Sequence, residues 1–191
     1  MSHKRDKDKD PVTDPTELPE AHLEGLGASF LGGIEQLRAG RIDQAIKTFR
    51  GILAVEPRLP EPRMELARIL LDTGRLHEAE AEAKEALRLL EAGGQWIEEL
   101  SEPIVLGLAH GLLAEVLRQV ADSDEVIFGP PERFHALTNE ARHHFAKAAT
   151  LDPENQHASY HAFFMNLEIP DGGMSLAAPP ELARDPDPTT D

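Results

Sequence analysis

The chain has 191 residues, with 19 Lys and Arg against 35 Asp and Glu, and it contains no cysteine. Its length suits one domain of ordinary size or two very small ones, and its 40% hydrophobic content is enough to form a core. The formal charge of −16 argues against a broad nucleic-acid-binding surface, because phosphates are bound by basic side chains. Without cysteine the chain has no disulfide, no thiolate zinc site and no cysteine nucleophile.

Membrane insertion and secretion are not expected from the sequence. No apolar run approaches the roughly 18 to 20 residues that a membrane helix requires. The charged start, MSHKRDKDKD, has no apolar stretch behind it and therefore differs from a secretory signal. We expect a cytoplasmic protein with no membrane and no nucleic-acid partner.

The chain divides into a helical centre and two polar arms. Residues 1–19 and 169–191 are rich in charge, proline and glycine, and we predict that both are disordered. Between residues 20 and 168 apolar side chains recur every three or four positions, which predicts helices, and no alternating pattern predicts a strand. The first helical face consists of Leu23, Leu26, Phe30, Ile34 and Leu37.

A fixed period of 34 residues organises the helical centre. One set of residues recurs after 34 positions, pairing Gly40, Arg41, Ile42, Ala45 and Leu53 with Gly74, Arg75, Leu76, Ala79 and Leu87. A second set recurs after 96 positions, pairing Ala45, Phe49, Val55 and Pro57 with Ala141, Phe145, Leu151 and Pro153. A third unit that followed directly would lie 68 positions after the first, so 28 residues are inserted, at about 94–106 and 122–135.

Glycine and alanine at these spacings favour helical hairpins. Gly40 and Gly74 stand where one helix must end and reverse, a position that favours a left-handed backbone. Ala45, Ala79 and Ala141 lie early in each return helix, where a small side chain allows close helix packing. A single hairpin cannot cover its own apolar face, so stacked neighbours are expected to complete the core.

This pattern resembles the tetratricopeptide repeat, a 34-residue helix–turn–helix unit with small, glycine, alanine, aromatic and proline positions. The first unit carries Gly33, Gly40, Ala45, Phe49 and Pro57 at these positions. The second departs from the pattern, since Ala83 replaces the aromatic residue and Glu91 the proline. The resemblance implies an all-α solenoid of about three repeats (26–59, 60–93, and 107–153 with insertion 122–135) plus a C-terminal capping helix at 154–168. We expect Tyr160, Phe163, Phe164 and Leu167 on this helix to cover the exposed end of the third unit.

The resemblance also implies where a partner binds, because the first helix of each unit lines a concave groove in this family. The family's lysine and asparagine clamp for peptide carboxylates is replaced here by Phe30 and Ile34, which disfavours a chaperone-tail receptor. An amphipathic helix, or an extended peptide with acidic residues that meet Arg68 and Arg118, suits the groove better. An alternative is that Phe30, Ile34 and Leu37 belong to the core. The groove positions are Phe30, Ile34, Leu37 and Arg38 in unit one, Glu61, Met64, Arg68, Leu71 and Asp72 in unit two, and Gly111, Glu115, Arg118 and Gln119 in unit three.

The histidines raise metal binding as an alternative to peptide binding. His157 and His161 stand four residues apart on one helix face, and His143 and His144 lie on the preceding helix. No glutamate stands between His157 and His161 in an HExxH arrangement, and the sequence fixes no third ligand, so we expect no metal site and no cofactor. His110 lies in an apolar helix and is interpreted as a hydrogen-bonded packing residue. No catalytic motif is present, and we expect no enzyme activity.

Two features stay open at the level of sequence. The insertion from Asp122 to His135 either binds a partner or folds back onto the body, and Trp96 is either a packing anchor or an exposed contact. The function indicated is an adaptor or scaffold that binds a protein or peptide partner. The alternatives are a small acidic chaperone of a secreted or assembling client and a metal-binding protein with a histidine cluster. The sequence leaves the oligomeric state open.

Overall fold

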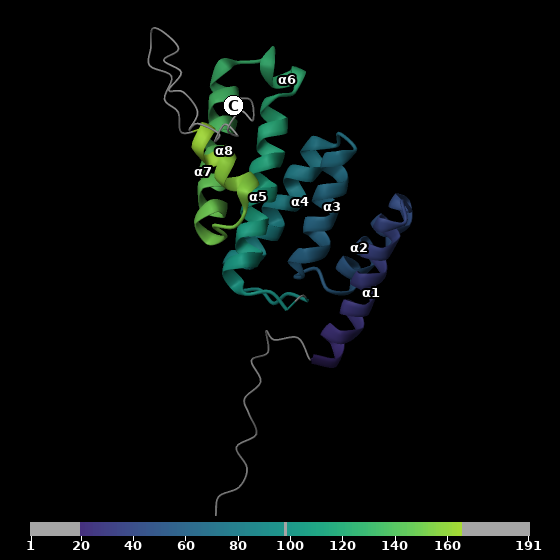
Figure 1. The fold of residues 1–191 in the computed structure, drawn as a ribbon. Helices are drawn as coiled ribbons and strands as arrows, with labels where there is room; N and C mark the ends of the chain where they lie inside the picture. The colour runs from purple at the N-terminus through teal and green to yellow at the C-terminus, as the bar shows by residue number, and fades with distance from the viewer. Residues whose placement is uncertain (1–19, 98, 166–191) are drawn as a thin grey trace, which may run out of the picture.

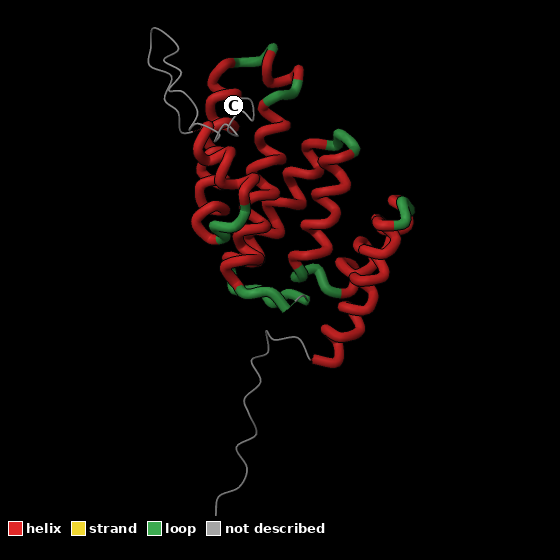
Figure 2. The backbone as a smooth tube through the Cα atoms, viewed as in Figure 1, coloured by secondary structure: helices red, strands yellow, loops and turns green. Residues whose placement is uncertain are grey.

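The computed structural model describes residues 20–97 and 99–165, and within them every regular element is a helix (Figures 1 and 2). The predicted arms, 1–19 and 169–191, lie outside the described residues, as do residues 166–168 of the predicted capping helix. The elements are α1 (Glu20–Arg38), α2 (Ile42–Val55), α3 (Pro60–Asp72), α4 (Leu76–Glu91), α5 (Glu102–Ala121), α6 (Asp124–Ile127), α7 (Pro131–Leu151) and α8 (Gln156–Met165).

The helices pair into three antiparallel hairpins that stack in chain order (Figure 1). The hairpins are α1 with α2, α3 with α4, and α5 with α7, and α8 packs against α7 at the end of the stack. The all-α solenoid predicted from the 34-residue period is therefore confirmed.

The turns inside the first two hairpins are built alike. Gly40 and Gly74 adopt φ values of +70° and +73°, which a residue with a Cβ atom rarely adopts. The next residue, Arg41 or Arg75, donates its backbone N–H to a carbonyl five residues earlier, so each helix ends in a Schellman motif. The glycines predicted from the repeat therefore terminate α1 and α3.

Small residues in the stack permit close helix packing. Ala45, Ala79 and Ala141 are fully buried. Ala45 and Ala79 lie in the first turn of α2 and α4, as predicted, whereas Ala141 lies at the middle of α7 because that helix begins at Pro131. A Cβ atom on Gly33 would lie 2.5 Å from the ring of Phe49, so glycine is required there for α2 to approach α1. Phe49 also packs on Phe30, with ring centroids 5.6 Å apart.

The prediction that no segment is long and apolar enough to cross a membrane is wrong for helix α5. Its 20 residues meet that criterion by length and composition. More than half of its most apolar window is buried within the fold, where α5 packs against α4 and α7. The central helix of a stacked repeat is covered on several sides, and this burial accounts for its apolar composition.

The insertion at 122–135 is a short helix followed by the start of α7, and not a long loop. Val126 on α6 is buried, and it anchors the insertion to the core. Ile127 and Phe128 remain exposed, with Phe128 85% accessible. The insertion therefore folds back onto the body, where Val126 is buried and Glu125 contacts His77 of α4, and it presents two apolar side chains outward.

The cap at the end of the solenoid uses the opposite face of its helix from the one that we predicted. Ala158 is fully buried against Phe145 and Ala148, and Ala162 and Met165 pack beside it. These three α8 residues are spaced at i, i+4 and i+7, which is one helical face. The aromatic residues lie on the other face, and Tyr160, Phe163 and Phe164 are 57%, 59% and 46% exposed. Leu167 lies outside the described residues.

Candidate protein-binding face

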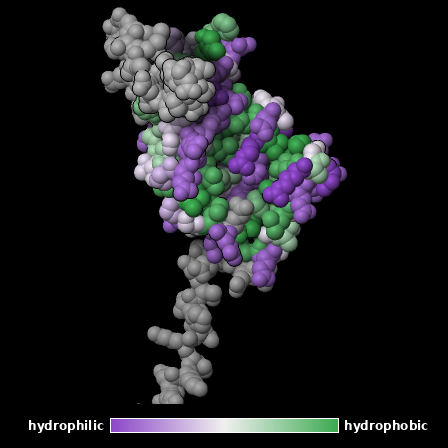
Figure 3. Space-filling model, viewed as in Figure 1, coloured by the Kyte–Doolittle hydropathy of each residue, from purple (hydrophilic) through white to green (hydrophobic). Residues whose placement is uncertain are grey.

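A groove lies where α1, α3 and α5 face one another. It has a volume of about 230 Å³, and both apolar and charged side chains line it. On the face of the molecule in Figure 3, hydrophilic side chains form ridges and hydrophobic surface lies between them. The residues that line the groove are Phe30, Glu61, Met64, Glu65, Arg68, Leu100, Val105 and Leu108.

Most of the apolar groove residues predicted from the family are part of the core. Phe30, Met64 and Leu71 are 2%, 5% and 7% exposed, and Ile34 and Leu37 are half-buried against the same core. Phe30 and Met64 still form part of the groove wall, whereas Leu71 does not. The alternative in which this side of α1 belongs to the core therefore describes the structure.

The two arginines expected to meet an acidic partner are already paired with carboxylates. Arg68 contacts Glu65 at 2.5 Å, and its side chain is 48% exposed. Arg118 is 33% exposed and binds Glu115 at 2.7 Å and Asp122 at 2.8 Å. The hydrogen bond that Arg118 donates to Glu115 raises the pKa of Arg118, and burial opposes this effect. An acidic segment would have to compete with these internal partners.

The connection between α4 and α5 covers one end of the groove, which the sequence did not predict. The backbone N–H of Ile97 donates to the carboxylate of Glu61 on α3, and the Ile97 side chain lies against Gly27 on α1. Trp96 donates its indole N–H to the carbonyl of Leu100 at 3.0 Å and packs against the core. Trp96 is thus a packing anchor. The signal for this role in the sequence was an aromatic residue that closely follows two glycines.

An exposed aromatic surface lies at the other end of the stack. Tyr160 and Phe164 are adjacent on α8, with ring centroids 4.3 Å apart, and Phe163 meets Phe164 edge to face. We call these three residues the α8 aromatic face. The sequence identified the residues but assigned them to the wrong side of the helix.

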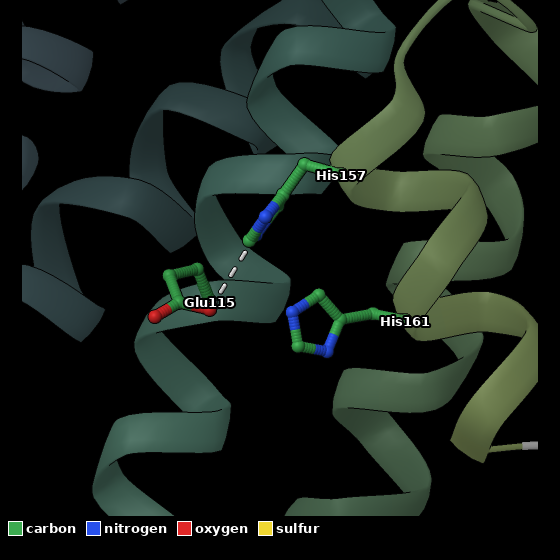
Figure 4. A group of neighbouring side chains, drawn as sticks. All are labelled: Glu115, His157 and His161. Atoms are coloured by element: carbon green, nitrogen blue, oxygen red, sulfur yellow. Dashed lines mark ion pairs between the residues drawn. The ribbon is translucent and has the colours of Figure 1, made fainter. Parts of the chain in front are cut away.

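Close to this face, α8 turns two histidines toward α5 (Figure 4). His157 and His161 point toward Glu115, and His157 Nε2 lies 3.7 Å from a carboxylate oxygen of Glu115. One ligand atom from each residue lies within 4.8 Å of the others. Burial lowers the pKa of His161, and the neighbouring His157 acts in the same direction.

His110 lies on the opposite side of α5 and pairs with His144 on α7. Its Nδ1 atom is 2.9 Å from Nδ1 of His144, so one ring donates and the other accepts. His110 is 3% exposed, and burial lowers its pKa to about 4. The structure thus confirms that His110 is a hydrogen-bonded packing residue. It forms part of a second groove of about 510 Å³, whose other residues are Glu91, Leu106, His143, Ala146, Lys147, Thr150 and Leu151.

Comparisons with known proteins agree with this architecture. The family model of the tetratricopeptide repeat matches residues 36–93, from the last turn of α1 to the turn after α4. Comparison with curated proteins gave no match. A similar solved structure is the Arabidopsis OM64 TPR domain, with a TM-score of 0.56 and 12% identity over 78% of this chain and 99% of that chain. At that identity the likeness shows the fold. Residues 36–93 therefore match the tetratricopeptide repeat, and the fold of the chain is that of a tetratricopeptide repeat solenoid.

Proposed function

We propose that the protein is a non-catalytic adaptor that binds a peptide or an amphipathic helix in the groove between α1, α3 and α5. The groove carries the proposal, because it joins an apolar floor to a charged rim. Val105 and Leu108 of α5 lie opposite Met64 of α3, and the Glu65–Arg68 pair borders them. Tetratricopeptide repeats are in general a protein-interaction architecture.

The size of the groove limits how a partner can use it. A volume of about 230 Å³ accommodates one or two apolar side chains and not a whole helix. We infer that a partner segment inserts one apolar anchor residue, since a few buried anchors supply most of the binding energy in such interfaces. The flanking residues of the segment then lie against Glu65 and Arg68.

Selection from a displayed peptide library tests this proposal without a known partner. Peptides selected on the full chain should share one large apolar residue, and Leu108→Lys should abolish their binding because it places a charge beside the groove floor. Ile104→Lys is the matched control. It lies on the same helix, is 40% exposed and does not line the groove.

The two variants separate a groove interaction from a nonspecific effect. Retained binding in Leu108→Lys, or a selection that yields no specific peptide, would contradict the proposal. Equal loss of binding in Ile104→Lys would show that charge anywhere on α5 is sufficient, and it would also argue against the groove.

A chaperone for an aggregation-prone client is the second candidate, and the α8 aromatic face favours it. Tyr160, Phe163 and Phe164 form an exposed apolar surface, which is a feature of binding surfaces. A chaperone should suppress light scattering by a heat-denatured model client, and replacing all three residues by serine should remove that effect. An adaptor should show no suppression in the same assay.

A further inference from the structure

Two neighbouring helices bring together a set of metal-binding side chains that lies outside the groove. His157 and His161 are one turn apart on α8, and their ring centroids are 4.5 Å apart. Glu115 reaches them from α5 (Figure 4). The sequence analysis expected no metal because spacing alone fixed no third ligand. The packing of α8 against the solenoid supplies that ligand from a helix distant in sequence.

The donor set has the composition of a zinc site. Two imidazoles and one carboxylate are a recurrent zinc ligand set, in which water or another ligand takes the fourth position. One ligand atom of each residue lies within 4.8 Å of the others, and His157 is 61% exposed, which leaves its ring room to rotate inward. A zinc ion at the usual distance of about 2 Å from each donor requires the three ligand atoms to draw closer together than this.

Neighbouring residues hold two of these side chains in place. Arg118 and Gln119 donate to Glu115, and the contact with His157 is made by Oε2, which accepts only one of these hydrogen bonds. Burial raises the pKa of Glu115, but the hydrogen bonds from Arg118 and Gln119 lower it more, so the carboxylate is ionised. The ring of His161 is stacked on Phe145 at 4.6 Å. Such surrounding contacts orient ligands in metal sites.

Arg118 brings a positive charge close to the cluster, and the structure compensates for it. The Arg118 guanidinium also binds Asp122 at 2.8 Å, so two carboxylates share its charge. The cluster therefore does not present an excess positive charge to an incoming cation.

We propose that Glu115, His157 and His161 form a binding site for a divalent transition metal, with Zn²⁺ as the expected ion. The metal links α8 to α5. In its absence α8 is held mainly by contacts with α7, and Ala158 is its one fully buried residue in the described part of the chain. Metal binding therefore fixes the end of the solenoid and the position of the α8 aromatic face. The inference does not depend on the peptide-binding proposal.

Isothermal titration of the full chain with Zn²⁺ at pH 7.5 tests the site. We expect one ion per chain. Replacing a residue that orients a metal ligand lowers the affinity for the metal about 10- to 100-fold. Replacing a ligand itself should lower the affinity at least as much. The variants are His157→Ala, Glu115→Gln and His161→Phe, and the last keeps a ring to stack on Phe145. His143→Ala is the matched control, since His143 is exposed on α7 and outside the cluster.

Hydrogen exchange provides a second measurement that reports on α8 itself. Zn²⁺ should increase the protection of α8 amides in the wild-type chain and in His143→Ala, and it should not do so in His161→Phe. Absence of saturable binding, or unchanged affinity in His157→Ala and His161→Phe, would overturn the proposal. Loss of binding in His143→Ala with retention in His161→Phe would also overturn it, because the ion would then lie on α7.

Discussion

The first two hairpins and the C-terminal part of the solenoid share one fold but are held together by different side chains. In α1–α4 the interior contains leucine, isoleucine, methionine and phenylalanine, and both turns use the same glycine motif. Where α5, α7 and α8 meet, the buried residues are mainly alanines around Phe145, with histidines beside them. The difference shows that a repeat can keep its backbone fold while large aliphatic and aromatic side chains are replaced in the core by alanines with histidines beside them.

The largest expected difference between the two regions concerns the two buried phenylalanines at equivalent repeat positions. Phe49 and Phe145 are both fully buried. Phe49→Ala should lower the free energy of unfolding by about 3–5 kcal/mol, because Phe30 and α1 cannot collapse fully into the space. Phe145→Ala should cost less, since α8 is attached mainly to α7 and can move into the cavity. Urea denaturation followed by circular dichroism measures both values.

Hydrogen exchange sharpens this first comparison. Phe145→Ala should expose the amides of α8 while α1–α4 remain protected, whereas Phe49→Ala should affect α1 and α2 first. A larger loss of stability in Phe145→Ala than in Phe49→Ala would contradict the view that the C-terminal contacts are the weaker ones.

Replacing a buried alanine by leucine should also affect the stability of the two regions differently. Ala79 and Ala158 are both fully buried. Ala79→Leu should lower the free energy of unfolding by about 1–3 kcal/mol, because α4 is confined between α3 and α5. Ala158→Leu should cost less, since the terminal helix can move outward. Equal midpoints of denaturation for the two variants would show that α8 is held as firmly as α4.

Acid should destabilise the C-terminal region through His110. Its pKa is about 4 in the folded chain and near 6.5 when unfolded, so the unfolded state binds more protons between these values. Stability is therefore fully present above pH 6.5 and falls as the pH decreases toward 4. This group alone accounts for a loss of about 2 kcal/mol by pH 5. Denaturant unfolding between pH 7 and pH 5, in metal-free buffer, measures the slope.

A conservative variant isolates the histidine contribution. His110→Gln keeps a group that can hydrogen-bond to His144, and it should flatten the dependence on pH over this range. Carboxylates with lowered pKa, such as Glu56 beside Arg58, act mainly at lower pH, because their unfolded pKa is near 4.3. An unchanged slope in His110→Gln would assign the acid sensitivity to other groups.

The regular part of the fold was predictable because it follows from local spacing. Gly40, Gly74, Ala45 and Ala79 recur at a fixed interval. The glycines adopt a positive φ that other residues rarely adopt, and the alanines are fully buried at close helix crossings. The groove was less predictable. Phe30 is buried against Phe49 of α2 and also forms part of the groove wall, and this placement depends on tertiary packing and not on local spacing.

The remaining features required three-dimensional contacts between distant segments. Nothing in the spacing of residues indicates that Ile97 reaches Gly27 and Glu61, or that Glu115 meets two histidines on α8. The orientation of α8 was misjudged for a different reason. Its aromatic residues suggested an apolar face, but the neighbouring helices leave room only for Ala158, Ala162 and Met165.

The smallest predicted effect is an increase in stability, and it tests how loosely α5 packs on α7. A Cβ atom on Gly111 of α5 would lie 3.8 Å from Ala148, an ordinary contact, so Gly111→Ala should stabilise the protein by about 0.5–1 kcal/mol. Gly33→Ala on α1 is the matched change in the N-terminal region, and it should destabilise because its Cβ atom would overlap the ring of Phe49. Opposite shifts of the denaturation midpoint are expected. If both variants are destabilised, the interface between α5 and α7 is as tightly packed as that between α1 and α2, and the contrast between the two regions does not extend to the helix crossings.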